Sequence, residues 1–301
     1  MTEGPIATRR RLEPLAWDTS ARRWAPASRR DCDATRGGTI AVATLNVLRD
    51  SLGGARRRGA VVDAVRSVDA DLVLLQEMTP ALTSRLARDP RIRRSYVLSD
   101  ADGATLDGDG IVIASRLPIT SLTRVALPSE SRRSAVVATV QLGAKARGPA
   151  LTVVSVHLEG RRVNVAARDR QLAVLARLVA RRSGPVVVAG DFNFCGTWAQ
   201  NARLDARWLD LWPALHPREA GWTVDTALSA TARRVEGGDD KRVRYDRIFL
   251  RSGARGHRLV PRRIDRFATE PVVALGGLSP SDHFGLVATF AFAAPRGRSR
   301  R

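Results

Sequence analysis

Carboxylate, amide and imidazole side chains stand at the ends of apolar runs in this chain. Polar residues that end strands gather at one edge of a sheet, where catalytic sites commonly form. One Asp or Asn in such a place is more often a turn residue, and one His is more often structural. A whole set in consistent positions favours a catalytic site, and its members are Asn46, Gln76, Glu77, His157, Asp191, Asn193, Asp246, Asp282 and His283.

The apolar runs beside these residues are rich in β-branched side chains and predict strands. Helical spacing predicts a helix over 56–69 and a clearer one over 164–182, with Asn164 as its N-cap. Strands in adjacent runs, with helices at only some crossovers, indicate mixed sheets in an α/β/β/α sandwich, whose strand order the periodicity leaves open. The predicted strands span 39–47, 71–77, 109–115, 134–142, 150–158, 185–190, 245–250 and 284–292.

The chain has 301 residues, enough for one large core or two modest domains. No long linker and no internal repeat interrupts it, so we predict one catalytic domain over 38–294. Residues 1–37 combine many arginines with little hydrophobic periodicity, and they predict a basic N-terminal arm that is flexible or partly ordered. Residues 295–301 form a basic tail.

The chain carries 50 Lys and Arg against 30 Asp and Glu, a formal net charge of +20. Its use of Arg in place of Lys is typical of GC-rich genomes, but that bias does not explain the excess of bases. A field of this size attracts polyanions, and it indicates nucleic acid as the first partner to consider.

Targeting signals and cysteines give little further direction. The sequence shows no run long enough to span a membrane, and its N-terminus lacks the apolar segment of a secretory signal. Cys32 and Cys195 lack the spacing of a zinc site and do not suggest a disulfide framework. We therefore expect a reducing, cytoplasmic setting.

Six short blocks resemble, in order, the signature blocks of the endonuclease/exonuclease/phosphatase superfamily. GDFN and SDH together are fairly specific, and the ordered set covers essentially all of 38–294. The resemblance implies a four-layered α/β/β/α sandwich of two mixed sheets, like that of DNase I, and a metal-dependent hydrolase that cleaves phosphodiesters. The blocks are TLNV (44–47), LLQEM (74–78), VHLEG (156–160), GDFNF (190–194), YDRIF (245–249) and SDHFG (281–285).

The resemblance implies a Mg²⁺ site, with Mn²⁺ able to substitute. Hydrolysis of an anionic phosphodiester needs its charge neutralised, and Mg²⁺ binds through one or two carboxylates while keeping several waters. Glu77 is the first expected ligand, Asn46 lies nearby, and Asp282 is a further or water-mediated ligand.

The resemblance also implies the roles of the remaining residues. Asp191 would orient or deprotonate the nucleophilic water, and Asn193 would contact the scissile phosphate. His283 would also contact the phosphate, while Asp246 accepts its other ring N–H and favours the imidazolium form. His157 is expected to be a second histidine that faces the phosphate. The alternative for Asp246 is a salt bridge at the strand end to Arg247 or Arg244.

After HLEG, the second half of the chain carries RDRQLAVL (168–175), GWTVDT (221–226), VRYDRIFLRS (243–252), HRLVPRRID (257–265) and LSPSDHFGL (278–286). These blocks resemble the branch of this superfamily that hydrolyses 5′-phosphotyrosyl bonds between DNA and a trapped topoisomerase. That resemblance places Arg132 or Arg133 near the substrate channel. Four tryptophans follow GDFNF, and a buried core is the commoner role for most of them, whereas Trp222 is the one to test for stacking on a base. Three positions depart from the pattern of that branch, and they are Gly160, Cys195 and Val224.

The leading hypothesis is a phosphodiesterase that acts at a nucleic-acid end, with DNA favoured and a 5′-tyrosyl adduct as one substrate. The same hydrolysis could instead serve a small phosphorylated metabolite, a nucleotide or a lipid. A third hypothesis is a basic nucleic-acid-binding protein without catalysis. It is weakened by the presence of Glu77, Asp191, Asp282 and His283.

Overall fold

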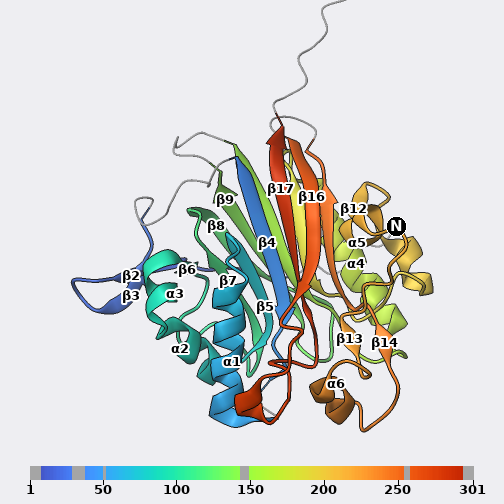
Figure 1. Ribbon diagram of the computed structural model, residues 1–301. Coiled ribbons are helices and arrows are strands. Elements are labelled where there is room, and N and C mark those ends of the chain that lie inside the picture. The colour runs from blue at the N-terminus through green and yellow to red at the C-terminus, as the bar shows by residue number, and fades with distance from the viewer. Residues whose placement is uncertain (1–7, 29–37, 50–51, 143–148, 254–257, 294–301) are drawn as a thin grey trace, which may run out of the picture.

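Two large sheets lie face to face at the centre of the molecule (Figure 1). The computed structural model of the protein describes residues 8–28, 38–49, 52–142, 149–253 and 258–293. The seven-stranded sheet has the order β1-β8-β9-β10-β11-β15-β12. Its strands are β1 (Arg9–Arg11), β8 (Ile119–Ala126), β9 (Ser134–Gln141), β10 (Ala150–His157), β11 (Val186–Asp191), β12 (Trp208–Asp210) and β15 (Asp246–Arg251).

The eight-stranded sheet has the order β16-β17-β4-β5-β7-β6-β2-β3, and a separate hairpin pairs β13 with β14. Both large sheets are mixed, since β4 pairs in parallel with β5 and β10 in parallel with β11, among antiparallel neighbours. The remaining strands are β2 (Leu15–Asp18), β3 (Arg23–Pro26), β4 (Thr39–Asn46), β5 (Leu72–Met78), β6 (Val97–Leu98), β7 (Gly110–Ser115), β13 (Val224–Asp225), β14 (Arg242–Val243), β16 (Arg258–Phe267) and β17 (Gly285–Ala293).

Helices cover the outer face of each sheet. α1, α2 and α3 pack on the eight-stranded sheet, and α4 packs on the seven-stranded sheet (Figure 1). No helix among the described residues is long and apolar enough to cross a membrane. The helices are α1 (Gly54–Ser67), α2 (Pro80–Ala87), α3 (Pro90–Ser95), α4 (Val165–Ala180), α5 (Leu211–Leu215) and α6 (Ala230–Val235), with 3₁₀ turns η1 (Ala199–Arg203) and η2 (Val273–Leu275).

Alternation along β5 shows how the layers are held together. Leu72 and Leu74 point into the core between the sheets, whereas Val73 and Leu75 point into the core beneath α1 and α2. A strand buried on both faces needs apolar residues at every position, which explains its unbroken apolar run. The predicted four-layered α/β/β/α sandwich of two mixed sheets is therefore confirmed.

The elements that the sequence did not predict are weakly apolar or short. Half of the residues in β8 and in β16 are polar, so their apolar periodicity is poor. The longest helix begins after Asn164, as predicted, but the side chain of this residue makes no capping hydrogen bond. Its Nδ2 donates instead to the carbonyl of Gly160 at 2.9 Å.

Part of the predicted N-terminal arm pairs with the two sheets. β1 is antiparallel to β8, while β2 pairs with both β3 and β6. Residues 8–28 are therefore built into the sheets at their edges. The basic tail over 295–301 lies outside the described residues, and the division into an arm, one domain and a tail stays a prediction.

Candidate active site

Three predicted site residues form a row across neighbouring strands of the seven-stranded sheet. His157 ends β10 and lies opposite Asp191, which ends β11. Asp191 in turn lies opposite Asp246, the first residue of β15. Pairing register alone therefore brings together side chains that are far apart in the sequence.

The eight-stranded sheet supplies the other half of the site. Asn46 at the end of β4 is paired with Gln76 on β5. Beyond Gln76, the register of β5 shifts against β7, and Glu77 adopts a left-handed backbone with φ of 60°. Such a conformation is strained for a residue with a side chain, and irregularities of this kind re-aim side chains at functional sites. The site is thus formed where the ends of two packed sheets meet, not at the edge of a single sheet as expected.

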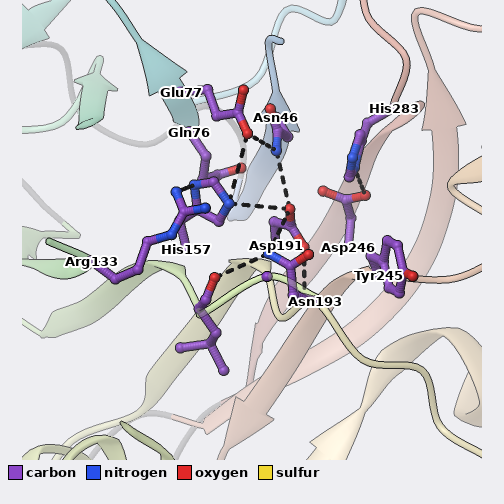
Figure 2. Close-up of polar contacts among 12 residues, drawn as sticks. Asn46, Gln76, Glu77, Arg133, His157, Asp191, Asn193, Tyr245, Asp246 and His283 are labelled. Carbon is purple, nitrogen blue, oxygen red and sulfur yellow. Dashed lines mark hydrogen bonds and ion pairs between the residues drawn. The ribbon is translucent and has the colours of Figure 1, made fainter. Parts of the chain in front are cut away.

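The Asn46 amide joins the two halves (Figure 2). Its Nδ2 lies 3.0 Å from Asp191 Oδ2 and 3.3 Å from Glu77 Oε1, and donates to both. Its Oδ1 accepts from the backbone N–H of Leu48, which fixes the amide orientation. The second oxygen of Glu77 accepts from the backbone N–H of Arg49 at 3.0 Å.

Asp191 is buried and its carboxylate is held in place on both sides. Oδ1 accepts from the backbone N–H of Asn193 at 2.8 Å, and Asn193 has a left-handed backbone with φ of 55°. The Asn193 amide also donates to the carbonyl of Leu158 at 3.0 Å. Burial raises the pKa of Asp191 to about 6, with the charge of Asp246 adding to the effect and His283 opposing it.

His283 and Asp246 form a buried ion pair, with His283 Nδ1 2.7 Å from Asp246 Oδ2. Burial alone would lower the pKa of His283, but Asp246 and Asp282 outweigh burial and raise it well above its usual value. Thr223 connects the backbone at both members of the pair. Its Oγ1 accepts from the backbone N–H of Asp246, and its carbonyl accepts from the backbone N–H of Phe284, the residue after His283. The alternative prediction, a salt bridge between Asp246 and a neighbouring arginine, is wrong, because the carboxylate of Asp246 pairs with His283.

The two arginines that could have made that salt bridge bind elsewhere. Arg244 and Arg247 both donate to the carboxylate of Asp210, at 3.0 Å and 2.5 Å. They hold β12 against β15, away from the histidine.

His157 is buried between Arg133 and the carboxylates. Its Nδ1 lies 2.8 Å from a guanidinium nitrogen of Arg133, and its Nε2 lies 3.4 Å from Asp191 Oδ2 and 3.8 Å from Glu77 Oε1. Burial, followed by the positive charge of Arg133, lowers the pKa of His157 to about 3. The site therefore holds one neutral histidine and one imidazolium near pH 7.

The expected metal ligands have the chemistry of a Mg²⁺ site. Burial raises the pKa of Asp282, the positive charge of His283 opposes this effect, and the negative charge of Glu77 raises the pKa further, so the charge of one expected ligand acts on the other. Two carboxylates and an amide are oxygen donors of the kind and number that Mg²⁺ uses when it keeps several waters. The described residues contain no group of three or more His, Cys, Asp or Glu side chains placed to hold a metal, as a zinc site would require.

The expected substrate residues lie at different distances from this centre. Arg132 and Arg133 line a small cavity together with His157, Asp109 and Ser131. Arg132 is exposed and pairs with Asp107 at 2.9 Å, so only Arg133 reaches a site residue.

Trp222 precedes Thr223, and its half-buried ring lies 5.2 Å from the guanidinium of Arg242. Val224, which replaces an aromatic of the related branch, is buried against Ala232 and Val243 in a small core. An aromatic at that position would face this core.

Arg57 on α1 was not predicted, yet it holds the chain on both sides of the candidate metal ligands. Its fully buried guanidinium donates to the carbonyls of Val47, Leu48 and Leu52, which follow Asn46. It also donates to the carbonyl of Pro280 at 3.1 Å, two residues before Asp282. Its position in a helix of mixed composition gave no signal of this role.

We expect Arg57→Met to lower the free energy of unfolding by about 3 kcal/mol or more, because it leaves several buried carbonyls without donors. Urea denaturation followed by circular dichroism measures the change. Arg56→Met, at an exposed position one residue earlier, is the matched control and should change stability by less than about 0.5 kcal/mol. A loss below about 1 kcal/mol in Arg57→Met would show that the carbonyls find other partners.

A sequence model described as the Endonuclease/Exonuclease/phosphatase family matches residues 43–283. The chain belongs to this family. The match includes every predicted site residue from Asn46 to His283, and it agrees with the four-layered fold.

Two relatives that share one name are similar to this chain. Tyrosyl-DNA phosphodiesterase 2 of Xenopus laevis is 28% identical over 241 residues, which cover 78% of this chain and 62% of that protein. The human protein of the same name is 28% identical over 233 residues, covering 72% and 58%. The chain thus spans about three fifths of the length of these relatives.

A crystal structure of D. rerio TDP2 complexed with a single-strand DNA product superposes with a TM-score of 0.73 at 25% identity, covering 84% of this chain and 98% of that chain. The resemblance to the tyrosyl-DNA branch is confirmed.

Proposed function

We propose that the protein is a Mg²⁺-dependent phosphodiesterase that acts at DNA ends, with a 5′-phosphotyrosyl bond as its leading substrate. The proposal is carried by one observation. A buried carboxylate, Asp191, lies between an amide that reaches Glu77 and a row that leads to the His283–Asp246 ion pair. This arrangement supports a site in which a base, a metal ligand and a cationic donor would surround one point.

Glu77 and Asp282, with Asn46 beside them, would hold the metal. A bound Mg²⁺ would neutralise charge on the phosphate and on the departing oxygen. The strained backbone at Glu77 aims its carboxylate toward the seven-stranded sheet, and the amide of Asn46 keeps it there. We propose that Arg57 fixes the spacing of these groups from behind, through the chain on either side of them.

Asp191 would orient the attacking water and accept its proton as the new P–O bond forms. A carboxylate whose pKa is raised to about 6 by burial is a stronger base than an ordinary aspartate. His283, as imidazolium, would donate from Nε2 to a non-bridging oxygen of the phosphate, and Asp246 would keep the ring charged and oriented. Asn193 and His157 would complete the contacts to the phosphate.

The substrate would be gripped by cationic and aromatic groups around this centre. Arg133 lies in the cavity beside His157, and its buried Nε has no hydrogen-bond partner among the residues that the structure describes. Trp222, beside Arg242, offers a ring for stacking on an unpaired base. The net charge of +20 supports an extended anionic substrate over a small metabolite. The cytoplasmic setting stays a prediction.

A substrate panel with Mg²⁺ tests the proposal. It comprises a 5′-phosphotyrosyl oligonucleotide, an abasic duplex, plain single and double strands, and RNA. We expect release of tyrosine that leaves a 5′-phosphate, loss of this activity with EDTA, and its return with Mg²⁺ or Mn²⁺. Absence of turnover with either metal on every substrate would favour a binding protein without catalysis.

Salt dependence gives a second test of the substrate class. If the arginines grip about four phosphates of a single strand, affinity should fall roughly 50-fold between about 50 and 200 mM salt, because counterions are released on binding. Fluorescence anisotropy of a labelled oligonucleotide, with Asp191→Asn to prevent cleavage, measures the slope. An affinity that does not change with salt would argue for a small or uncharged substrate.

A further inference from the structure

A buried carboxylate outside the proposed catalytic set lies two residues after His157. Glu159 is 4% exposed, and its two oxygens accept from the hydroxyls of Ser129 and Ser131, the latter at 2.6 Å. These serines belong to the turn that joins β8 to β9. The carboxylate therefore ties this turn to the end of β10.

Hydrogen bonds within the turn and from α4 fix the turn between β8 and β9. Ser129 Oγ accepts from the backbone N–H groups of Ser131 and Arg133, at 3.0 Å and 3.1 Å. Gln171 on α4 donates to the carbonyl of Pro128 and accepts from the backbone N–H of Glu159, at 3.0 Å and 2.9 Å. The backbone of Arg133 is thus fixed relative to β10 through a short chain of hydrogen bonds.

Arg132 and Arg133, at the end of this turn, contact different partners. Arg132 has a left-handed backbone with φ of 56° and pairs with Asp107. Arg133 carries its guanidinium inward to His157 Nδ1 at 2.8 Å. A turn with a different shape would move this guanidinium away from the ring.

The contact decides which nitrogen of His157 carries the proton. A guanidinium has donors and no acceptor, so Nδ1 of His157 must be the acceptor and cannot hold a proton. The ring proton then sits on Nε2, which faces Asp191 Oδ2 at 3.4 Å and Glu77 Oε1 at 3.8 Å. The opposite tautomer would turn a lone pair toward two carboxylates.

We propose that Glu159 is a positioning residue, which holds the turn over 128–133 so that Arg133 fixes the Nε2–H tautomer of His157. Through this chain, His157 presents a donor to the place where Asp191 and the phosphate meet. The consequence for turnover rests on the proposed function, whereas the tautomer itself does not. Its effect on rate should resemble that of other groups that orient a catalytic side chain, about 10- to 100-fold.

Nitrogen-15 NMR of histidine-labelled protein with Mg²⁺ present reads the tautomer directly. The chain has four histidines, and His157→Gln assigns the signal of interest. We expect His157 Nδ1 to be unprotonated in the wild type and to carry the ring proton in a measurable fraction of molecules in Arg133→Met, because no donor then excludes the Nδ1–H tautomer. Glu159→Ala should produce the same change in part, and Glu159→Gln less of it, since an amide can still bond both serines.

Glu130→Gln is the matched control, because Glu130 lies exposed in the same turn. It should leave the His157 signal and the rate unchanged. Unaltered His157 signals in both Arg133→Met and Glu159→Ala would overturn the proposal.

A double-mutant cycle separates positioning from a general structural role. Glu159→Ala alone should lower kcat/KM about 10- to 100-fold, yet add less than about threefold to the loss in Arg133→Met. Additive losses would contradict action through Arg133. If the wild type turns over no phosphodiester, the proposed function fails, and the NMR series still decides the role of Glu159.

Discussion

Asp191→Asn should lower kcat about 10³- to 10⁴-fold while the protein remains folded. The variant keeps the size of the side chain but removes the base that would take the proton from the attacking water, a contribution of this order in general-base catalysis. KM should change little, since Asn193, His157 and His283 remain to contact the phosphate. Steady-state kinetics on the 5′-phosphotyrosyl oligonucleotide measure both constants.

The buried position of Asp191 makes a folding control necessary. Its Oδ1 can still accept from the backbone N–H of Asn193, but the new NH₂ group would face the Asn46 amide. We expect the free energy of unfolding to fall by no more than about 2 kcal/mol. Asp63→Asn, whose side chain is 69% exposed on α1, serves as the control with unchanged rate. A kcat within tenfold of wild type in Asp191→Asn would remove this residue from the mechanism.

Glu77→Gln should weaken metal binding and lower turnover by about a hundredfold or more. The substitution keeps the shape of the side chain, and an amide fits the left-handed backbone as well as a carboxylate does. It removes one of two negative charges from the proposed ligand set, and Mg²⁺ depends on carboxylates for its affinity. Calorimetric titration with Mn²⁺ measures binding without reference to activity.

The metal dependence of the rate gives the second readout for Glu77. Half-saturation by Mg²⁺ should move to at least tenfold higher concentration, and part of the lost rate should return at high metal. Glu236→Gln, at a half-buried salt bridge with Lys241, is the control. If Mn²⁺ affinity is unchanged in Glu77→Gln, the metal site lies elsewhere.

Much of the fold was predictable because its strands are buried on one or both faces. Apolar runs such as 39–47 and 185–190 match β4 and β11 to within one residue at each end. β16 and the strands over 8–28 were missed, because strands at or near a sheet edge can carry arginines that local periodicity interprets as loop or arm.

The candidate site was predictable to the extent that its residues stand at the ends of those strands. Asn46, Asp191 and Asp246 were placed correctly because a polar residue at the end of an apolar run is a local signal. Contacts that depend on register carry no such signal. The Asn46–Asp191 hydrogen bond, for example, joins residues 145 positions apart.

What the sequence by itself determined is therefore the set of strands and the chemical groups at their ends, since both follow from neighbouring residues. Only the tertiary structure decided that the ends of two sheets meet, that Glu77 leaves the regular strand, and that Arg133 faces His157. These features arise because packing between distant segments selects one register and one backbone conformation from many that the local sequence allows.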